Sequence, residues 1–231
     1  MPLFIVATPI GNPLDFTLRA LETLKAADLI IGEELKVLRQ TLKAAGVSGK
    51  TLDQLNEHSR EVDFKHFVEE CKVKRVALVS DCGTPGFCDP GAELVAACAQ
   101  AGVKVHAVPG PSSLMALLSV SGVRLSEFVF SGFLPTKAGP RAKALAELRR
   151  ERRPCVVMET PYRCERLVDD LARELGGRRC VLGLNLTQEN ERVIRALGRD
   201  LPAHGPYENA EPVVLILPGD NGPCREQKSK S

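Results

Sequence analysis

The stretch from Val76 to Gly91 (VALVSDCGTPGFCDPG) constrains the fold of this chain more than any other. It begins with four apolar residues, Val76 to Val79, which are enough for one buried strand. Ser80, Asp81 and a run of glycine and proline follow, and a helical pattern resumes at Ala92. A strand, a glycine-rich turn and a helix in this order bring bare backbone close to a ligand at the carboxyl end of a sheet. The stretch therefore predicts a ligand-binding loop.

A tight connection between strand and helix is the alternative interpretation, with Asp89 as N-cap and Pro90 at the first helical position. Such connections are usually short, so they leave the three glycines, two prolines and two aspartates of this stretch unexplained. The stretch is not a Walker phosphate loop, because no Gly-Lys-Ser/Thr closes it. Asp81 stands where a carboxylate can accept hydrogen bonds from a ribose or an amino group.

Two other predicted strands end in similar breaks. Leu3 to Ala7 runs into Thr8–Pro13, and Val103 to Val108 runs into Pro109–Ser113. The first half alternates strands and helices, which predicts a parallel sheet with helices on both faces. The carboxyl ends of parallel strands share one edge, so the three loops should meet there.

The pattern changes between Ser121 and Ser126. The strands predicted beyond it have few long helices between them, which indicates a mixed or antiparallel sheet; they are 127–131, 155–158, 179–186, 192–197 and 212–217. We therefore expect an N-terminal domain at 1–120, a C-terminal domain at 121–220 and a disordered tail at 221–231. The polar segment 48–59 is expected to be irregular.

Composition narrows the classes of function. A formal charge of +2 on 231 residues is too small to imply nucleic-acid binding by net charge alone. The eight cysteines form no Cys-x-x-Cys pair and have no histidine at zinc-ligand spacing, so we expect reduced thiols and no metal in a cytoplasmic protein. The N-terminus has no basic region ahead of its apolar run, and no run reaches membrane-spanning length, so we expect neither a signal peptide nor membrane association.

Taken together, these loops resemble the tetrapyrrole methylase family of S-adenosylmethionine-dependent methyltransferases. Within it, they are most similar to the small-subunit ribosomal RNA (cytidine-2′-O)-methyltransferases. The resemblance covers about Leu3 to Gly219, and its motifs are Ala7–Asn12, Thr17–Leu21, Val79–Gly91, Val108–Ser113 and Gly132–Pro135.

The resemblance implies an α/β fold of two domains, with S-adenosylmethionine in the cleft between them and a homodimer as the assembly. It also implies cofactor contacts at Pro9, Val79, Ser80, Asp81, Gly83, Phe87, Ser112, Ser113, Glu159 and Ala196. The family usually has glycine near the last of these positions.

The departures from the family concern the methyl acceptor. The RNA branch usually has Ala-Glu-Asp-Thr-Arg where this chain has Gly32–Lys36 (GEELK), and Tyr-Glu-Ser-Pro-His-Arg where it has Met158–Arg163 (METPYR). The helical C-terminal extension of that branch has no counterpart after Gly219. The resemblance implies 2′-O-methylation of a cytidine in small-subunit ribosomal RNA, with that RNA or the small ribosomal subunit as partner. The alternatives are methylation of a small molecule, such as a tetrapyrrole precursor, and a non-catalytic module that only binds the cofactor.

A ribose hydroxyl is a poor nucleophile, so a nearby base would help. Glu33, Glu34 and Glu159 are candidates because each follows a predicted strand, although a glutamate there can equally favour a helix N-terminus. Lys137, Arg141, Arg149 and Arg150 belong to a basic segment that can follow a phosphate backbone or simply form a solvated helix face. Phe133 and Tyr162 are the nearby aromatic residues.

Overall fold

The computed structural model describes residues 1–56, 58–87, 89 and 91–219, and the tail predicted at 221–231 lies outside them. The chain divides into two compact units, Met1–Ser113 and Leu114–Ser231. This division falls at the start of helix α5 (Ser113–Val120), whereas the sequence boundary was placed after that segment. Leu117 of α5 packs against Gly183 of the second unit, where a Cβ atom would lie 2.9 Å from Leu117 Cδ1.

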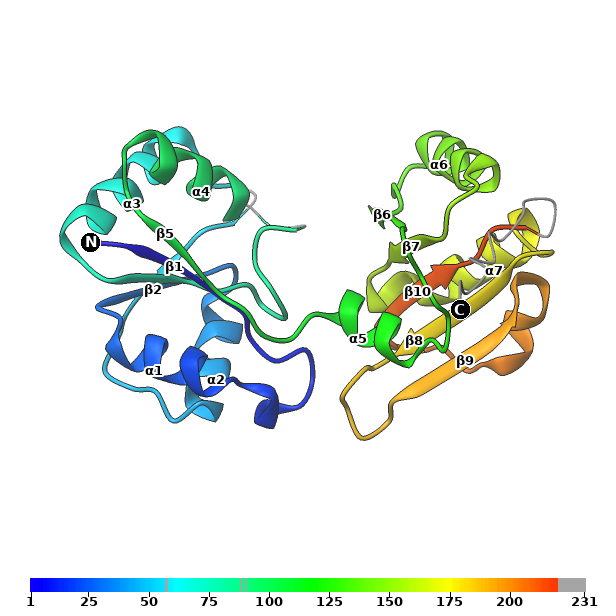
Figure 1. Ribbon diagram of the computed structural model, residues 1–231, viewed down its shortest axis with the longest axis horizontal. Coiled ribbons are helices and arrows are strands. Elements are labelled where there is room, and N and C mark those ends of the chain that lie inside the picture. Colours follow the sequence, from blue (N-terminus) through cyan, green and yellow to red (C-terminus); the bar gives the residue numbers. More distant parts are fainter. Residues whose placement is uncertain (57, 88, 90, 220–231) are drawn as a thin grey trace, which may run out of the picture. The chain divides into compact units, whose positions relative to one another are not determined.

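The first unit is built on a parallel five-stranded sheet of order β3-β2-β4-β1-β5. Figure 1 shows α3 and α4 on one side of this sheet and α1 and α2 on the other. The unit's elements are β1 (Leu3–Val6), η1 (Pro13–Asp15), α1 (Leu18–Ala26), β2 (Leu29–Gly32), α2 (Leu35–Ala44), β3 (Thr51–Gln54), α3 (Glu61–Val73), β4 (Val76–Leu78), α4 (Gly91–Gln100) and β5 (Val105–Val108).

The alternation of side chains along the strands explains why both faces are covered. Leu3 and Val76 face the core under α3 and α4, while Val6 and Ala77 face the core under α1 and α2. Strands buried on both faces are nearly all apolar, as these are. The predicted parallel sheet with helices on both faces is confirmed.

Strand β3 was not expected, because the whole of 48–59 was predicted to be irregular. Thr51 to Gln54 pairs in parallel with Leu29 to Gly32 at the edge of the sheet. A strand at the edge of a sheet has a neighbouring strand on one side only, and its other edge faces solvent, so it needs few apolar side chains. Its polar sequence therefore gives little strand signal.

The second unit contains a mixed sheet of order β6-β7-β10-β8-β9, in which β6 and β7 are parallel and the other neighbouring strands are antiparallel. Its apolar core lies between this sheet and helices α6 and α7 (Figure 1). The predicted mixed sheet is confirmed. The unit's elements after α5 are β6 (Val129–Phe133), α6 (Ala138–Arg150), β7 (Cys155–Met158), η2 (Pro161–Arg163), α7 (Cys164–Glu174), β8 (Arg179–Leu184), β9 (Arg192–Leu197), η3 (Gly198–His204) and β10 (Pro212–Ile216).

Helices in the described part of the chain are all too short or too polar to span a bilayer.

Candidate active site

Three loops meet at the carboxyl edge of the first sheet, and hydrogen bonds join them. The Thr8 amide donates to Gly83 O at 2.9 Å, and the Gly83 amide donates back to Thr8 O at 3.2 Å. Thr84 Oγ1 then donates to Pro111 O at 2.9 Å. The loops after β1, β4 and β5 therefore form one connected surface, as their positions in the sequence predict.

Asp81 adds the end of β2 to this surface. Its Oδ1 accepts a hydrogen bond from the Glu34 amide at 3.1 Å, across the gap between the loops after β4 and β2. Burial, with the nearby Glu34 carboxylate, raises the pKa of the Asp81 carboxyl above its ordinary value, although the Glu34 amide opposes this shift. No hydrogen bond to Asp81 Oδ2 is found within the described residues. A partly buried acceptor of this kind suits a ligand hydroxyl or amino group.

The other cofactor residues expected in the first unit lie along the same edge. Val79 and Ser80 are buried at the end of β4, and Ser80 Oγ donates to Cys82 O at 3.2 Å. Pro9 is half-buried next to Thr8, and the Phe87 side chain is 61% exposed. Ser112 and Ser113 are half-buried where α5 begins.

Two glycines allow the loops of this edge to pack closely. Gly83 is buried and has φ +80°, which side-chain-bearing residues rarely adopt. A Cβ atom on Gly110 would lie 3.0 Å from Ala7 Cβ, so a side chain there would push the loops after β1 and β5 apart. Both positions therefore need glycine for the three loops to meet.

Glu33 and Glu34 have different roles. Glu34 is the N-cap of α2, where its side chain accepts from the Lys36 amide at 3.5 Å, so the helix-terminus interpretation holds for it. Glu33 directly follows β2 and is half-buried. Its carbonyl accepts a hydrogen bond from Gln54 Nε2 at 2.9 Å, which fixes its backbone at the carboxyl edge.

Glu159, the glutamate predicted in the second unit, is a buried ion-pair partner. Its side chain is 0% exposed, with Oε2 at 2.9 Å from Arg141 Nη1 and Oε1 at 2.5 Å from Arg163 Nη2. Oε1 also accepts from the Thr160 amide at 2.9 Å. A carboxylate held by two guanidinium groups and an amide has little capacity to take a substrate proton. The geometry therefore argues against Glu159 as a general base.

Arg141 is buried as well, which corrects its assignment to an RNA-binding surface. It is 2% exposed, and its Nε donates to Asp170 Oδ2 at 2.6 Å while Nη1 pairs with Glu159. Arg141 lies one helical turn after Lys137 on α6, and the sequence does not distinguish which basic residues of a helix turn inward.

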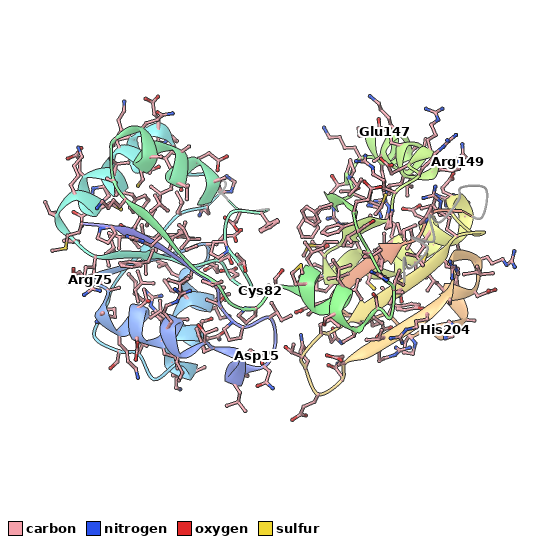
Figure 2. All side chains as sticks on the ribbon, viewed as in Figure 1. Asp15, Arg75, Cys82, Glu147, Arg149 and His204 are labelled. Carbon is pink, nitrogen blue, oxygen red and sulfur yellow. The ribbon has the colours of Figure 1, made fainter. Side chains whose placement is uncertain are left out.

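The remaining basic candidates are accessible. Lys137, Arg149 and Arg150 are exposed, and Figure 2 shows Arg149 extending outward from α6 near Glu147. The Arg149 side chain is 59% exposed and lies 3.8 Å from Glu174, a distance at which the ion pair is weak. Three of the four predicted RNA-binding residues therefore reach solvent.

The sheet register does not bring Ala196 to the same edge as Glu159. Ala196 pairs with Cys180, which pairs with Ile216, and Ile216 pairs with Cys155 at the start of β7. Glu159 follows the end of β7, so the two residues lie at opposite ends of the sheet, roughly 13 Å apart along the strand direction.

Asn185 lies at the Glu159 edge and was missed from the sequence. It follows β8 with φ +51°, it is buried, and its Oδ1 accepts from the Glu211 amide at 2.8 Å. The Glu159 amide donates to Pro212 O at 3.3 Å, which ties β7 to the same end of β10. A polar residue directly after a buried apolar strand is the signal that would have found Asn185.

A charge-neutral variant tests the environment of Asp81. Because its folded-state pKa is raised, stability falls as pH rises through the titration of this carboxyl. Asp81→Asn keeps an Oδ1 acceptor for the Glu34 amide but cannot ionise. We expect it to be more stable than the wild type at pH 7, by less than about 1 kcal/mol because solvent screens the group. The difference should shrink as pH falls towards 4, which thermal denaturation across this range measures; a gain that persists at pH 4 would contradict the argument.

A comparison with protein families gives a match to the tetrapyrrole (corrin/porphyrin) methylases over residues 2–202. The chain belongs to this family. Members are S-adenosylmethionine-dependent methyltransferases, so this chain is a methyltransferase and S-adenosylmethionine is its cofactor.

Several curated relatives of this methylase have the same name. A Neisseria meningitidis protein named ribosomal RNA small subunit methyltransferase I is 39% identical over 223 residues, or 95% of this chain and 77% of the relative. A Thermotoga maritima protein of the same name is 35% identical over 221 residues, or 94% of this chain and 98% of that protein.

Solved structures share the fold of this methylase at low sequence identity. A diphthine synthase has a TM-score of 0.75 at 17% identity and covers 94% of this chain and 90% of its own. The uroporphyrin-III C-methyltransferase from Thermus thermophilus, solved with S-adenosylhomocysteine, has a TM-score of 0.63 at 18% identity, with 94% and 97% covered.

Proposed function

We propose that this methyltransferase methylates the 2′-oxygen of a cytidine ribose in small-subunit ribosomal RNA. The observation that supports this most is 35–39% identity to proteins named ribosomal RNA small subunit methyltransferase I, over 94–95% of this chain. The solved diphthine synthase and uroporphyrin-III-C-methyltransferase share the fold at only 17% and 20% identity.

The first unit supplies the cofactor surface in this proposal. Asp81 Oδ2 accepts from a ribose hydroxyl or amino group of the cofactor, and Gly83 and Gly110 keep the loops around it closely packed. When bound, S-adenosylmethionine supplies a methyl group on a sulfonium that is already a good leaving group. The remaining task of the protein is to align the acceptor oxygen with that methyl group and to exclude water.

We assign the acceptor side to Glu33. It is the candidate base because it directly follows β2 at the carboxyl edge of the first sheet, where the loops that we assign to the cofactor also end. On the cofactor side of the second unit, we propose Asn185 in place of Ala196, because Asn185 shares the sheet end of Glu159.

Exposed cations on α6 give a second test. We expect Arg149→Glu combined with Arg150→Glu to weaken RNA binding about tenfold at moderate salt and to lower the slope of log affinity against log salt by one to two. Titration of ribosomal RNA fragments at several salt concentrations measures both quantities. Lys65→Glu with Lys72→Glu on α3 is the matched control, as it changes the net charge equally. Equal losses of RNA affinity in both double variants would show that net charge, and not the position of Arg149 and Arg150, causes the weaker binding.

The proposed function is tested by methyl transfer. Calorimetric titration with S-adenosylmethionine and S-adenosylhomocysteine should give one site per chain. Labelled S-adenosylmethionine should then transfer its methyl group to small ribosomal subunits or their RNA, at a cytidine that resists alkaline cleavage after modification. Labelling of a tetrapyrrole precursor instead of RNA would establish the small-molecule alternative, and cofactor binding without any labelled acceptor would favour a binding module.

A further inference from the structure

Tyr162 is the most exposed large hydrophobic residue in the part of the chain that the structure describes. It is 90% exposed, and it lies in η2, which follows β7 and Glu159. The chain contains two tyrosines and no tryptophan, and the other tyrosine, Tyr207, is 4% exposed. An exposed aromatic ring alone needs no explanation, so its surroundings decide whether it has a role.

The backbone that presents Tyr162 is firmly held. The Arg163 amide donates to Thr160 O at 3.0 Å, and Arg163 Nε donates to Thr160 Oγ1 at 3.2 Å. Arg163 Nη2 also reaches the buried Glu159, which Arg141 holds from the other side. A ring on a fixed turn loses little conformational entropy when a ligand contacts it.

Cations and a second aromatic side chain lie near this turn. Arg166 Nη1 donates to Thr136 O at 3.2 Å, which joins the first turn of α7 to the loop after β6. Lys137, the next residue of that loop, is exposed, and Phe133 at the end of β6 is 40% exposed. Phe133 pairs with Met158 across the two parallel strands, so both strands end at this edge. Glu165 offsets part of the positive charge.

An exposed ring among cations fits single-stranded nucleic acid, whose bases stack on aromatic side chains while its phosphates meet lysine and arginine. We propose that Tyr162 stacks on an unpaired base of the RNA substrate, with Lys137 and Arg166 near the flanking phosphates. This inference rests on the proposed function and makes it more specific: the substrate offers an unpaired segment at this edge of the second unit. Stacking accepts any base, so Tyr162 contributes affinity and not sequence choice.

Three substitutions separate stacking from other contributions. We expect Tyr162→Phe to bind a fluorescein-labelled single-stranded RNA of roughly 12 nucleotides from the small-subunit sequence as the wild type does. Tyr162→Leu and Tyr162→Ala should each bind it about tenfold more weakly in an anisotropy titration. S-adenosylmethionine affinity and thermal stability should not change in any of the three. Val73→Ala, which trims a 68% exposed side chain on α3, is the matched control.

Each other result overturns the inference. Binding of Tyr162→Ala within twofold of the wild type removes Tyr162 from the RNA surface. Wild-type affinity in Tyr162→Leu shows an apolar contact without stacking, and a loss in Tyr162→Phe assigns the effect to the hydroxyl. Methyl transfer by the wild type to small ribosomal subunits tests the proposed function separately. If the wild type transfers no methyl group, the proposed function fails; if the Tyr162 variants keep their RNA affinity, only this inference fails.

Discussion

Replacing Arg141 with methionine is expected to lower the free energy of unfolding of the second unit by about 3–5 kcal/mol. Arg141 is 2% exposed and pairs with both Glu159 and Asp170, which are themselves buried. Methionine fills similar space but leaves the two carboxylates without their shared cation, and a buried charge without its partner is costly. Urea or thermal denaturation measures the loss, which should lower the melting temperature by roughly 10 °C or more.

Arg150→Met is the matched control, because Arg150 is an exposed arginine on the same helix and should cost less than about 0.5 kcal/mol. Arg141→Lys should fall between the two, since an ammonium keeps the charge but cannot reproduce the planar fork that reaches both carboxylates. Neutralising Glu159 and Asp170 in the Arg141→Met background should restore part of the loss. Equal stability of Arg141→Met and Arg150→Met would refute a structural role for this ion-pair cluster.

Gly83→Val is expected to weaken S-adenosylmethionine binding at least tenfold. A residue with a side chain at φ +80° costs about 1–2 kcal/mol, and the added Cβ would lie 3.3 Å from Ile10 Cγ2. The loop relieves this strain by moving away from Thr8, which breaks the pair of hydrogen bonds that joins the loops after β1 and β4. Calorimetric titration with S-adenosylmethionine measures the effect.

Gly102→Val separates this effect from backbone strain. Gly102 has φ +73° with open space around its Cβ position, and it lies between α4 and β5, at the end of the sheet away from the three loops. Both variants should lose stability, and only Gly83→Val should lose cofactor affinity. Wild-type affinity in Gly83→Val would remove the loop after β4 from the cofactor site.

The sequence predicts those parts of the structure that depend on residues close together along the chain. The loop after β4 can be located from glycine, proline and aspartate directly after a buried strand, and the parallel first sheet follows from alternating apolar strands and helices. The same reasoning places Asp81 and Gly83 correctly at the carboxyl edge. Each of these inferences needs only the neighbouring residues and the general rules of parallel sheets.

The misses concern pairing between distant segments. Arg141 has the composition of a solvated helix residue, and only the arrival of Asp170 from α7 and Glu159 from β7 turns it inward. The assignment of Ala196 to the cofactor stays a prediction, and only the register of β8 and β9 shows that it lies at the other end of the sheet from Glu159. Thr51 to Gln54 forms a strand because β2 offers it an edge, which its own polar sequence does not indicate.

The position of β10 has a consequence for biosynthesis. This strand is the last one along the described chain, yet it lies in the middle of its sheet, between β7 and β8. The first unit is complete once Ser113 has left the ribosome, so it can fold while translation continues. The second sheet, in contrast, remains two separate ribbons with open edges until Pro212 to Ile216 emerges. A chain truncated before Pro212 would therefore contain a folded first unit joined to strands with exposed edges. Such edges favour aggregation and leave the second unit open to proteolysis.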